Sequence, residues 1–259
     1  MRKSVFILNL VVLFFGAYYI LDTIYFNDLR KLINVRLNQI GLSHIITYAL
    51  LGIPLVLGTL VITKFSSFFS AIGLKAAFFK PLLFALICTA PMFIGYALVF
   101  DFNVEVSLNH LLIGVLAAAF FEELYFRGFL FGMLYRFTRF GFIPSVFFGA
   151  LLFASAHLYQ SSDLGTMFGI FVTTLLGAVL FAWVYAEWKF SIWVPVFLHL
   201  FMNLSWMLFS AGDNAFGGIY ANVFRIITIT LIITGTLYYK KKQGLKLEVN
   251  MQTLLMKKP

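Results

Sequence analysis

Eight long apolar stretches limit what this chain can fold into. A helix needs about 20 apolar residues to cross the hydrocarbon core of a bilayer. The stretches run over residues 4–21, 44–63, 81–100, 110–135, 143–159, 165–186, 192–210 and 219–239. Lipid cannot satisfy open backbone groups, and the stretches lack the short alternating pattern of a membrane β-barrel. The sequence therefore predicts an all-α polytopic membrane protein with about eight transmembrane helices in one bundle.

Composition supports this class and excludes others. Of the 259 residues, 62% are hydrophobic and only 11% are charged, whereas soluble domains average about 25% charged residues. The single cysteine, Cys88, excludes an intramolecular disulfide and a site built from several thiolates. Because no repeat or low-complexity linker divides the chain, we expect residues 1–259 to form a single membrane domain.

The basic residues predict how the chain sits in the membrane. With the N-terminus inside, nearly all lysines and arginines outside the spans fall on the inner side; the exceptions are Arg30, Lys31 and Arg36 in the first loop. This bias predicts that both termini are cytoplasmic. A lysine-rich tail, residues 240–259, is then expected to face anionic lipid head groups rather than nucleic acid. The short chain, without a targeting sequence, suggests a bacterial inner (cytoplasmic) membrane.

Two adjacent carboxylates interrupt the fourth span. A charged side chain at the bilayer centre costs at least about 2.5–3.5 kcal/mol. Glu122 and Glu123 are therefore expected to serve a function rather than to fill space between helices. Glu123 and Arg127 are four residues apart and can pair on one helix face. Glu122 then points in another direction and stays free for chemistry.

Other polar residues lie in the fifth and seventh spans. His157 follows a stretch rich in small residues, which allows a close approach to a neighbouring helix. His199 and Asn203 share a face of the seventh span, where both can donate hydrogen bonds in one direction. Taken alone, His157 or the pair of His199 and Asn203 is equally well explained by polar contacts that hold helices together. If they converge with Glu122, they supply a base, a second water-binding group and two oxyanion donors, which is the inventory for hydrolysing an amide.

These residues carry a resemblance to a known family. Glu122-Glu123-x-x-x-Arg127, Phe153-x-x-x-His157 and His199-x-x-x-Asn203 resemble, in order, the three motifs of the CPBP intramembrane proteases. This family, also called Abi, includes CAAX proteases, bacteriocin-processing enzymes and the Ras-converting CAAX endopeptidase. The likeness covers about residues 81–210, which we expect to be the catalytic core.

The resemblance implies an intramembrane endopeptidase that uses a glutamate. Glu122 with His157 would activate water, and His199 and Asn203 would stabilise the oxyanion. Glu123 and Arg127 would have a supporting role. The expected substrate is a peptide or a protein end at the membrane, processed in a CAAX-type or bacteriocin-like way. No cofactor is expected.

Three alternatives remain open from the sequence. The chain lacks His-Glu-x-x-His, the spacing typical of zinc proteases, but Glu122, His157 and His199 are still three possible zinc ligands. The same residues suit a proton relay in a proton-coupled transporter, although the paired broken helices of many transporters are missing. A non-catalytic immunity protein would also retain them for binding.

Overall fold

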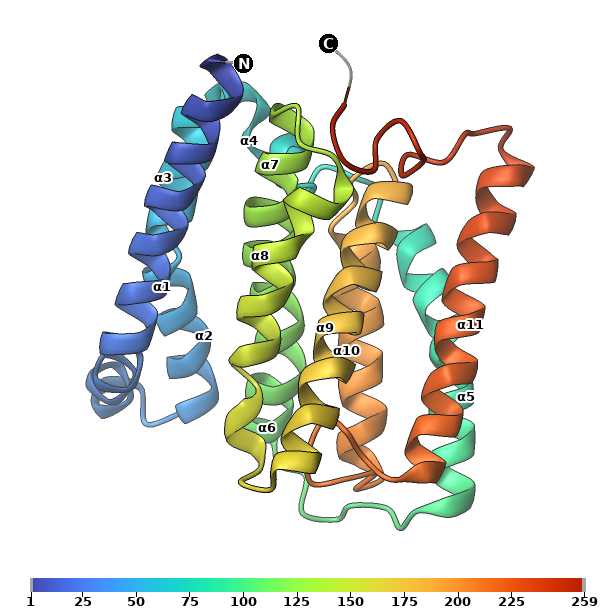
Figure 1. Ribbon diagram of the computed structural model, residues 1–259. Helices are drawn as coiled ribbons and strands as arrows, with labels where there is room; N and C mark the ends of the chain where they lie inside the picture. The colour runs from blue at the N-terminus through green and yellow to red at the C-terminus, as the bar shows by residue number, and fades with distance from the viewer. Residues whose placement is uncertain (1, 258–259) are drawn as a thin grey trace.

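The computed structural model describes residues 2–257, and these residues form a helical bundle (Figure 1). Met1, Lys258 and Pro259 lie outside the described residues, so the last two positions of the predicted tail 240–259 are not part of this description. The elements in chain order are α1 (Arg2–Leu37), α2 (Ile40–Leu51), α3 (Ile53–Ile62), η1 (Phe65–Ser67), α4 (Phe68–Ala71), α5 (Phe79–Val99), α6 (Leu108–His110), η2 (Leu111–Phe131), α7 (Gly132–Phe137), α8 (Phe142–Ser155), η3 (Leu158–Gln160), α9 (Leu164–Glu187), α10 (Trp193–Leu208) and α11 (Ile219–Lys242).

The predicted all-α polytopic architecture is confirmed. Within the described residues, 6 helical segments are long and apolar enough to cross a membrane. The shorter apolar helix Trp193–Leu208 and the continuous run α6–η2–α7 complete the set of eight expected spans. Large apolar side chains such as Leu13 and Phe148 are exposed on the outside of the bundle, which is the arrangement that lipid requires. The chain is therefore an integral, multi-pass membrane protein.

The second predicted span is broken in the middle, where α2 gives way to α3. Gly52 lies at the break, and Pro54 follows in the first turn of α3. A Cβ atom on Gly52 would lie only 2.1 Å from the Tyr125 hydroxyl. That hydroxyl donates a hydrogen bond to the Tyr48 carbonyl oxygen at 2.7 Å. Glycine at this position therefore allows η2 to pack closely against the break.

The helix η2 lies between the two halves of the bundle. On one side its residues join a core with α1 and α3, which includes Val11, Leu55 and Tyr125. On the other side η2 joins a core with α8, α9 and α10. Its hydrogen bonding is of the π type, as in the bond from the Gly132 N–H to the Arg127 carbonyl, and such segments are frequent at functional sites. Glu123, whose side chain is fully buried, is therefore surrounded by protein.

Both ends of the described chain lie at the same end of the bundle, at the top of Figure 1. The helix α1 starts there, and α11 returns to it before the C-terminal segment crosses over the ends of the neighbouring helices. The structure thus places the two termini on one side, as the basic residues predict. Which side of the membrane this is stays a prediction.

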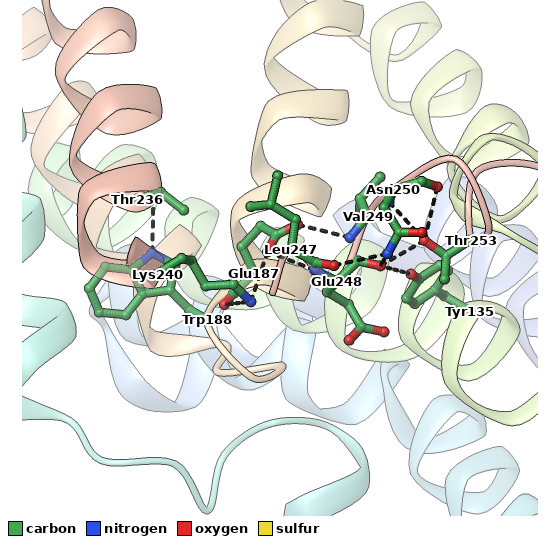
Figure 2. Close-up of polar contacts among 10 residues, drawn as sticks. All are labelled: Tyr135, Glu187, Trp188, Thr236, Lys240, Leu247, Glu248, Val249, Asn250 and Thr253. Carbon is green, nitrogen blue, oxygen red and sulfur yellow. Dashed lines mark hydrogen bonds and ion pairs between the residues drawn. The ribbon is translucent and has the colours of Figure 1, made fainter. Parts of the chain in front are cut away.

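The C-terminal tail is folded onto the bundle (Figure 2). Lys240 is buried, and its ammonium nitrogen lies 2.9 Å from Glu187 Oε2. The same carboxylate accepts hydrogen bonds from the backbone amides of Glu248 and Val249, at 3.0 and 2.9 Å. The carboxylate of α9 therefore fastens the end of α11 and the tail together, and Lys240 does not face the head groups.

The last described residues of the tail pack on α7 and α8. The amides of Phe142 and Ile143 donate to the carbonyls of Thr253 and Leu254 at 2.8 and 2.9 Å. Lys257 lies over the Tyr135 ring, and burial lowers the pKa of its ammonium group. The exposed lysines 241, 242 and 246 remain the part of the tail for which contact with anionic head groups is still a prediction.

Candidate active site

The carboxylate of Glu123 is the centre of the polar cluster in η2. Its Oε1 lies 3.0 Å from Arg127 Nη1 and 2.8 Å from His199 Nδ1. The Glu123 side chain is fully buried, and that of Arg127 is 3% exposed. A buried carboxylate is tolerable only when it is paired and hydrogen-bonded. Glu123 therefore links η2 to α10 as well as to its own helix.

Glu122 has a different environment, although it is the adjacent residue. Its side chain is 22% exposed, and its Oε2 lies 4.0 Å from His199 Nε2. That distance is too long for a hydrogen bond, but one oxygen atom between the two groups can contact both. His199 thus faces Glu123 with one ring nitrogen and Glu122 with the other.

Two phenylalanines hold Arg127 in place. Its guanidinium carbon lies 4.7 Å from the ring centroid of Phe153 in α8 and 5.6 Å from that of Phe181 in α9. Each ring also contacts one of the histidines: Phe153 lies against His157 and Phe181 against His199, with centroid separations of 4.7 and 5.8 Å. Cation–π contacts are worth about 2 kcal/mol when desolvated. The sequence pattern offers no signal for Phe181, which lies in an ordinary apolar run.

His157 sits at the end of α8, on the turn that leads into η3. Its Nδ1 lies 2.7 Å from the Phe153 carbonyl oxygen. A carbonyl only accepts hydrogen bonds, so this contact places a proton on Nδ1 and leaves Nε2 as the acceptor of the neutral ring. Within residues 2–257, no hydrogen bond or ion pair joins His157 to Glu122.

Asn203 lies one helical turn beyond His199 on α10. Its side-chain amide nitrogen donates to the Gly114 carbonyl oxygen of η2 at 2.9 Å. An asparagine amide has two N–H donors, so this bond uses one of them. The structure therefore groups Glu122, Glu123, Arg127 and His199, whereas His157, on the turn after α8, and Asn203, on α10, flank this group.

One further carboxylate faces this region and was missed in the sequence analysis. Asp22 belongs to α1, and its Oδ1 is buried without a hydrogen-bond partner among the described residues. Asp22 and Glu122 are close enough for their charges to interact. The signal was the position of Asp22 directly after the apolar run 4–21, in a helix that continues to Leu37.

The three possible zinc ligands are not arranged as a ligand set in this conformation. Across residues 2–257, no group of three or more His, Cys, Asp or Glu side chains is placed to hold a metal ion. Glu122 and His199 Nε2 approach each other at 4.0 Å, and the contact of His199 Nδ1 with Glu123 leaves Nε2 free. The zinc alternative therefore requires His157 to move toward Glu122 and His199.

Residues 104–205 match the model of a protein family described as type II CAAX prenyl endopeptidase Rce1-like. The expected CPBP resemblance is confirmed. This Rce1-like segment runs from the loop before α6 into α10 and contains all three motifs.

A similar relative is a Bacillus subtilis protein named "Putative membrane peptidase YdiL". It is 39% identical over 85 residues, which are 32% of this chain and 29% of that protein. The likeness to this relative thus spans less than a third of its length. No solved structure matches the chain significantly.

Proposed function

We propose that this protein is an intramembrane endopeptidase in which Glu122 activates a water molecule for attack on a peptide bond. The observation that carries this proposal is the position of His199, which touches the buried carboxylate of Glu123 and faces the more exposed carboxylate of Glu122. The Rce1-like segment and the name of the Bacillus relative support the same class of reaction.

Glu122 suits the role of general base. It is the half of the acidic pair that is not held by Arg127, and its side chain is 22% exposed. In the proposed reaction, Glu122 accepts a proton from water while the water oxygen attacks the carbonyl carbon. The proton then passes to the departing amine as the C–N bond breaks. A positioned general base of this kind contributes about 10²–10⁴-fold to a rate.

His199 suits the stabilisation of the oxyanion. Glu123 is ionised when it pairs with Arg127, so the His199 Nδ1 must carry the proton that it shares with this carboxylate. Nε2 can donate to the oxyanion only when the ring is the imidazolium. In that form Arg127 and His199 together balance the charges of Glu123 and Glu122. We therefore propose Glu123 and Arg127 as positioning residues that hold His199 and neutralise the cluster.

The flanking residues complete the proposed site. The second amide N–H of Asn203 is left over from its bond to Gly114 and suits a second oxyanion donor. The Nε2 of His157 is an acceptor that suits the attacking water, because Nδ1 is held by the Phe153 carbonyl. This assignment requires His157 to approach Glu122 when substrate is bound, since catalytic contacts are often long in unliganded proteins.

We propose that the substrate is a peptide or protein end held at the membrane. The matched family is described as a CAAX prenyl endopeptidase, which favours a prenylated peptide end. Apart from Arg30, Lys31 and Arg36, most lysines and arginines lie near the helix ends on the side that carries both termini, and by the positive-inside rule we expect this side to face the cytoplasm. The peptide is then expected to enter from that side.

Cleavage by the full-length protein in nanodiscs tests the proposal. The probes are an internally quenched peptide ending in a farnesylated CAAX sequence and the same peptide without the lipid. We expect Glu122→Gln to lose at least about 100-fold in rate. Glu105→Gln, at an exposed loop residue, should retain the wild-type rate and is the matched control. Wild-type cleavage by Glu122→Gln would overturn the mechanism.

A further inference from the structure

A second polar feature lies at the end of the bundle that carries both termini, away from the acidic cluster. It is a cavity of about 470 Å³ between the segment leading from α4 into α5, α7, the turn from α9 to α10, and α11. Its walls include four basic residues, Lys75, Lys80, Arg136 and Lys189, and no acidic one. Cavities of about 300–1,000 Å³ are the usual size of small-molecule sites.

The four basic side chains have no counter-ion of their own. Within residues 2–257, none of them forms an ion pair with a carboxylate. Arg136 donates instead to the backbone carbonyls of Ser70 and Ala71, at 3.1 and 2.6 Å. The nearby Glu187 is already matched by Lys240 and by two backbone amides. The cavity therefore carries a concentrated positive charge.

A buried hydroxyl in the wall of the cavity also lacks a partner. Ser191 is 4% exposed, and its Oγ has no hydrogen bond to any described residue. Buried polar groups nearly always have a partner, and this hydroxyl is free to donate to a group bound in the cavity. The helix α5 starts at the same wall with Lys80 in its first turn, and no side chain caps it. The free N–H groups at a helix start favour an anion.

The wall is held in an unusual backbone conformation. Lys189 and Phe190 are consecutive non-glycine residues with φ of 56° and 58°, a left-handed conformation that side chains rarely adopt. Gly73, with φ of 81°, allows the backbone of Phe190 to approach closely. A Cβ atom on Gly73 would lie 2.3 Å from the Phe190 carbonyl oxygen. This close contact shapes the turn that presents Lys189 to the cavity.

Aromatic rings form the remaining wall and suit the depth of the lipid head groups. Trp188 and Tyr239 stack with their ring centroids 4.3 Å apart, and Trp188 Nε1 donates to Thr236 Oγ1 at 3.1 Å. Tryptophan and tyrosine are enriched where a membrane protein meets the interface. The cavity lies at the helix ends, where this interface is expected.

From the charge, the unpartnered hydroxyl and the interfacial position, we propose that this cavity binds the phosphate of an anionic phospholipid head group. The lysines and Arg136 would neutralise the phosphate, and Ser191 would donate to one of its oxygens. The site is separate from the proposed peptidase residues and does not depend on that function.

Lipid binding to the full-length protein in a non-ionic detergent tests the proposal, with phosphatidylglycerol, phosphatidylcholine and inorganic phosphate as the probes. Removing three cavity charges in K75Q/K80Q/K189Q should weaken phosphatidylglycerol binding on the order of 100-fold, at about fivefold per lysine. The control R30Q/K31Q/R36Q removes the same charge from the opposite end of α1 and should change binding less than about threefold, because such attraction falls off within a Debye length. The charge-retaining K75R/K80R/K189R should bind as the wild type does, which separates charge from folding.

Equal losses in the cavity variant and the α1 variant, or equal binding of phosphatidylcholine, would overturn the site. If inorganic phosphate binds as tightly as phosphatidylglycerol, the ligand is free phosphate, and the assignment to a lipid is overturned.

Discussion

The two adjacent glutamates should respond differently when each loses its charge. Glu123→Gln keeps the shape of the side chain but leaves Arg127, which is 3% exposed, without its ion-pair partner at 3.0 Å. Removing one partner of a buried pair costs about 3–5 kcal/mol. Arg127 keeps its contact with the Phe153 ring at 4.7 Å, so we expect a loss of about 3 kcal/mol in the free energy of unfolding.

Glu122→Gln should cost much less, because the Glu122 side chain is 22% exposed and the His199 ring that faces it is 4.0 Å away. We expect a change below about 1 kcal/mol. The assay is unfolding of the full-length protein in mixed micelles by titration with sodium dodecyl sulfate, followed by tryptophan fluorescence. The double variant E123Q/R127Q should recover part of the loss, because it leaves no unpaired buried charge. Equal losses in the two single variants would refute the assignment of different roles.

Three further predictions concern the tail, the helix break and metal dependence. Glu187→Gln should release the tail, because the Glu187 carboxylate accepts hydrogen bonds from two tail amides. Limited proteolysis followed by mass spectrometry should then show faster cleavage within residues 243–257 than in the control Glu248→Gln, where only the backbone amide of Glu248 contacts Glu187. Equal cleavage rates would argue against a role of Glu187 in holding the tail. Gly52→Ala should destabilise the fold by about 1–3 kcal/mol in the detergent titration, because its Cβ would lie 2.1 Å from the Tyr125 hydroxyl, whereas Gly16→Ala, with nothing within 4 Å, should be neutral. Peptide cleavage should survive excess chelator, and a loss that added zinc restores would favour a metal-dependent reaction.

The helices could be predicted closely because their signal is local. A run of apolar residues long enough to cross a bilayer identifies a span wherever it packs, and the runs at 81–100 and 165–186 correspond to α5 and α9. The pair formed by Glu123 and Arg127 is local too, since it needs only one helical turn. What the sequence could not show is where such a helix breaks, as α2 and α3 do at Gly52 to admit Tyr125.

Contacts between distant helices account for what the sequence analysis missed. Glu123 was expected to pair within its own helix, but the packing of α10 on η2 also brings it 2.8 Å from His199, 76 residues away. Lys240 was expected to face lipid, yet Glu187, 53 residues earlier, buries it through the packing of α11 on α9. Asp22 was missed because an apolar run shows where a helix enters the bilayer better than where it ends. No local pattern carries this information.

The rate of peptide cleavage by Glu122→Gln is the most direct test of the central claim. It should be measured beside the wild type in the same nanodiscs, with the unfolding titration as proof that both proteins are folded. The proposed mechanism predicts a stable protein that has lost at least about 100-fold in cleavage rate. A folded Glu122→Gln protein that cleaves the same peptide at the wild-type rate would contradict it.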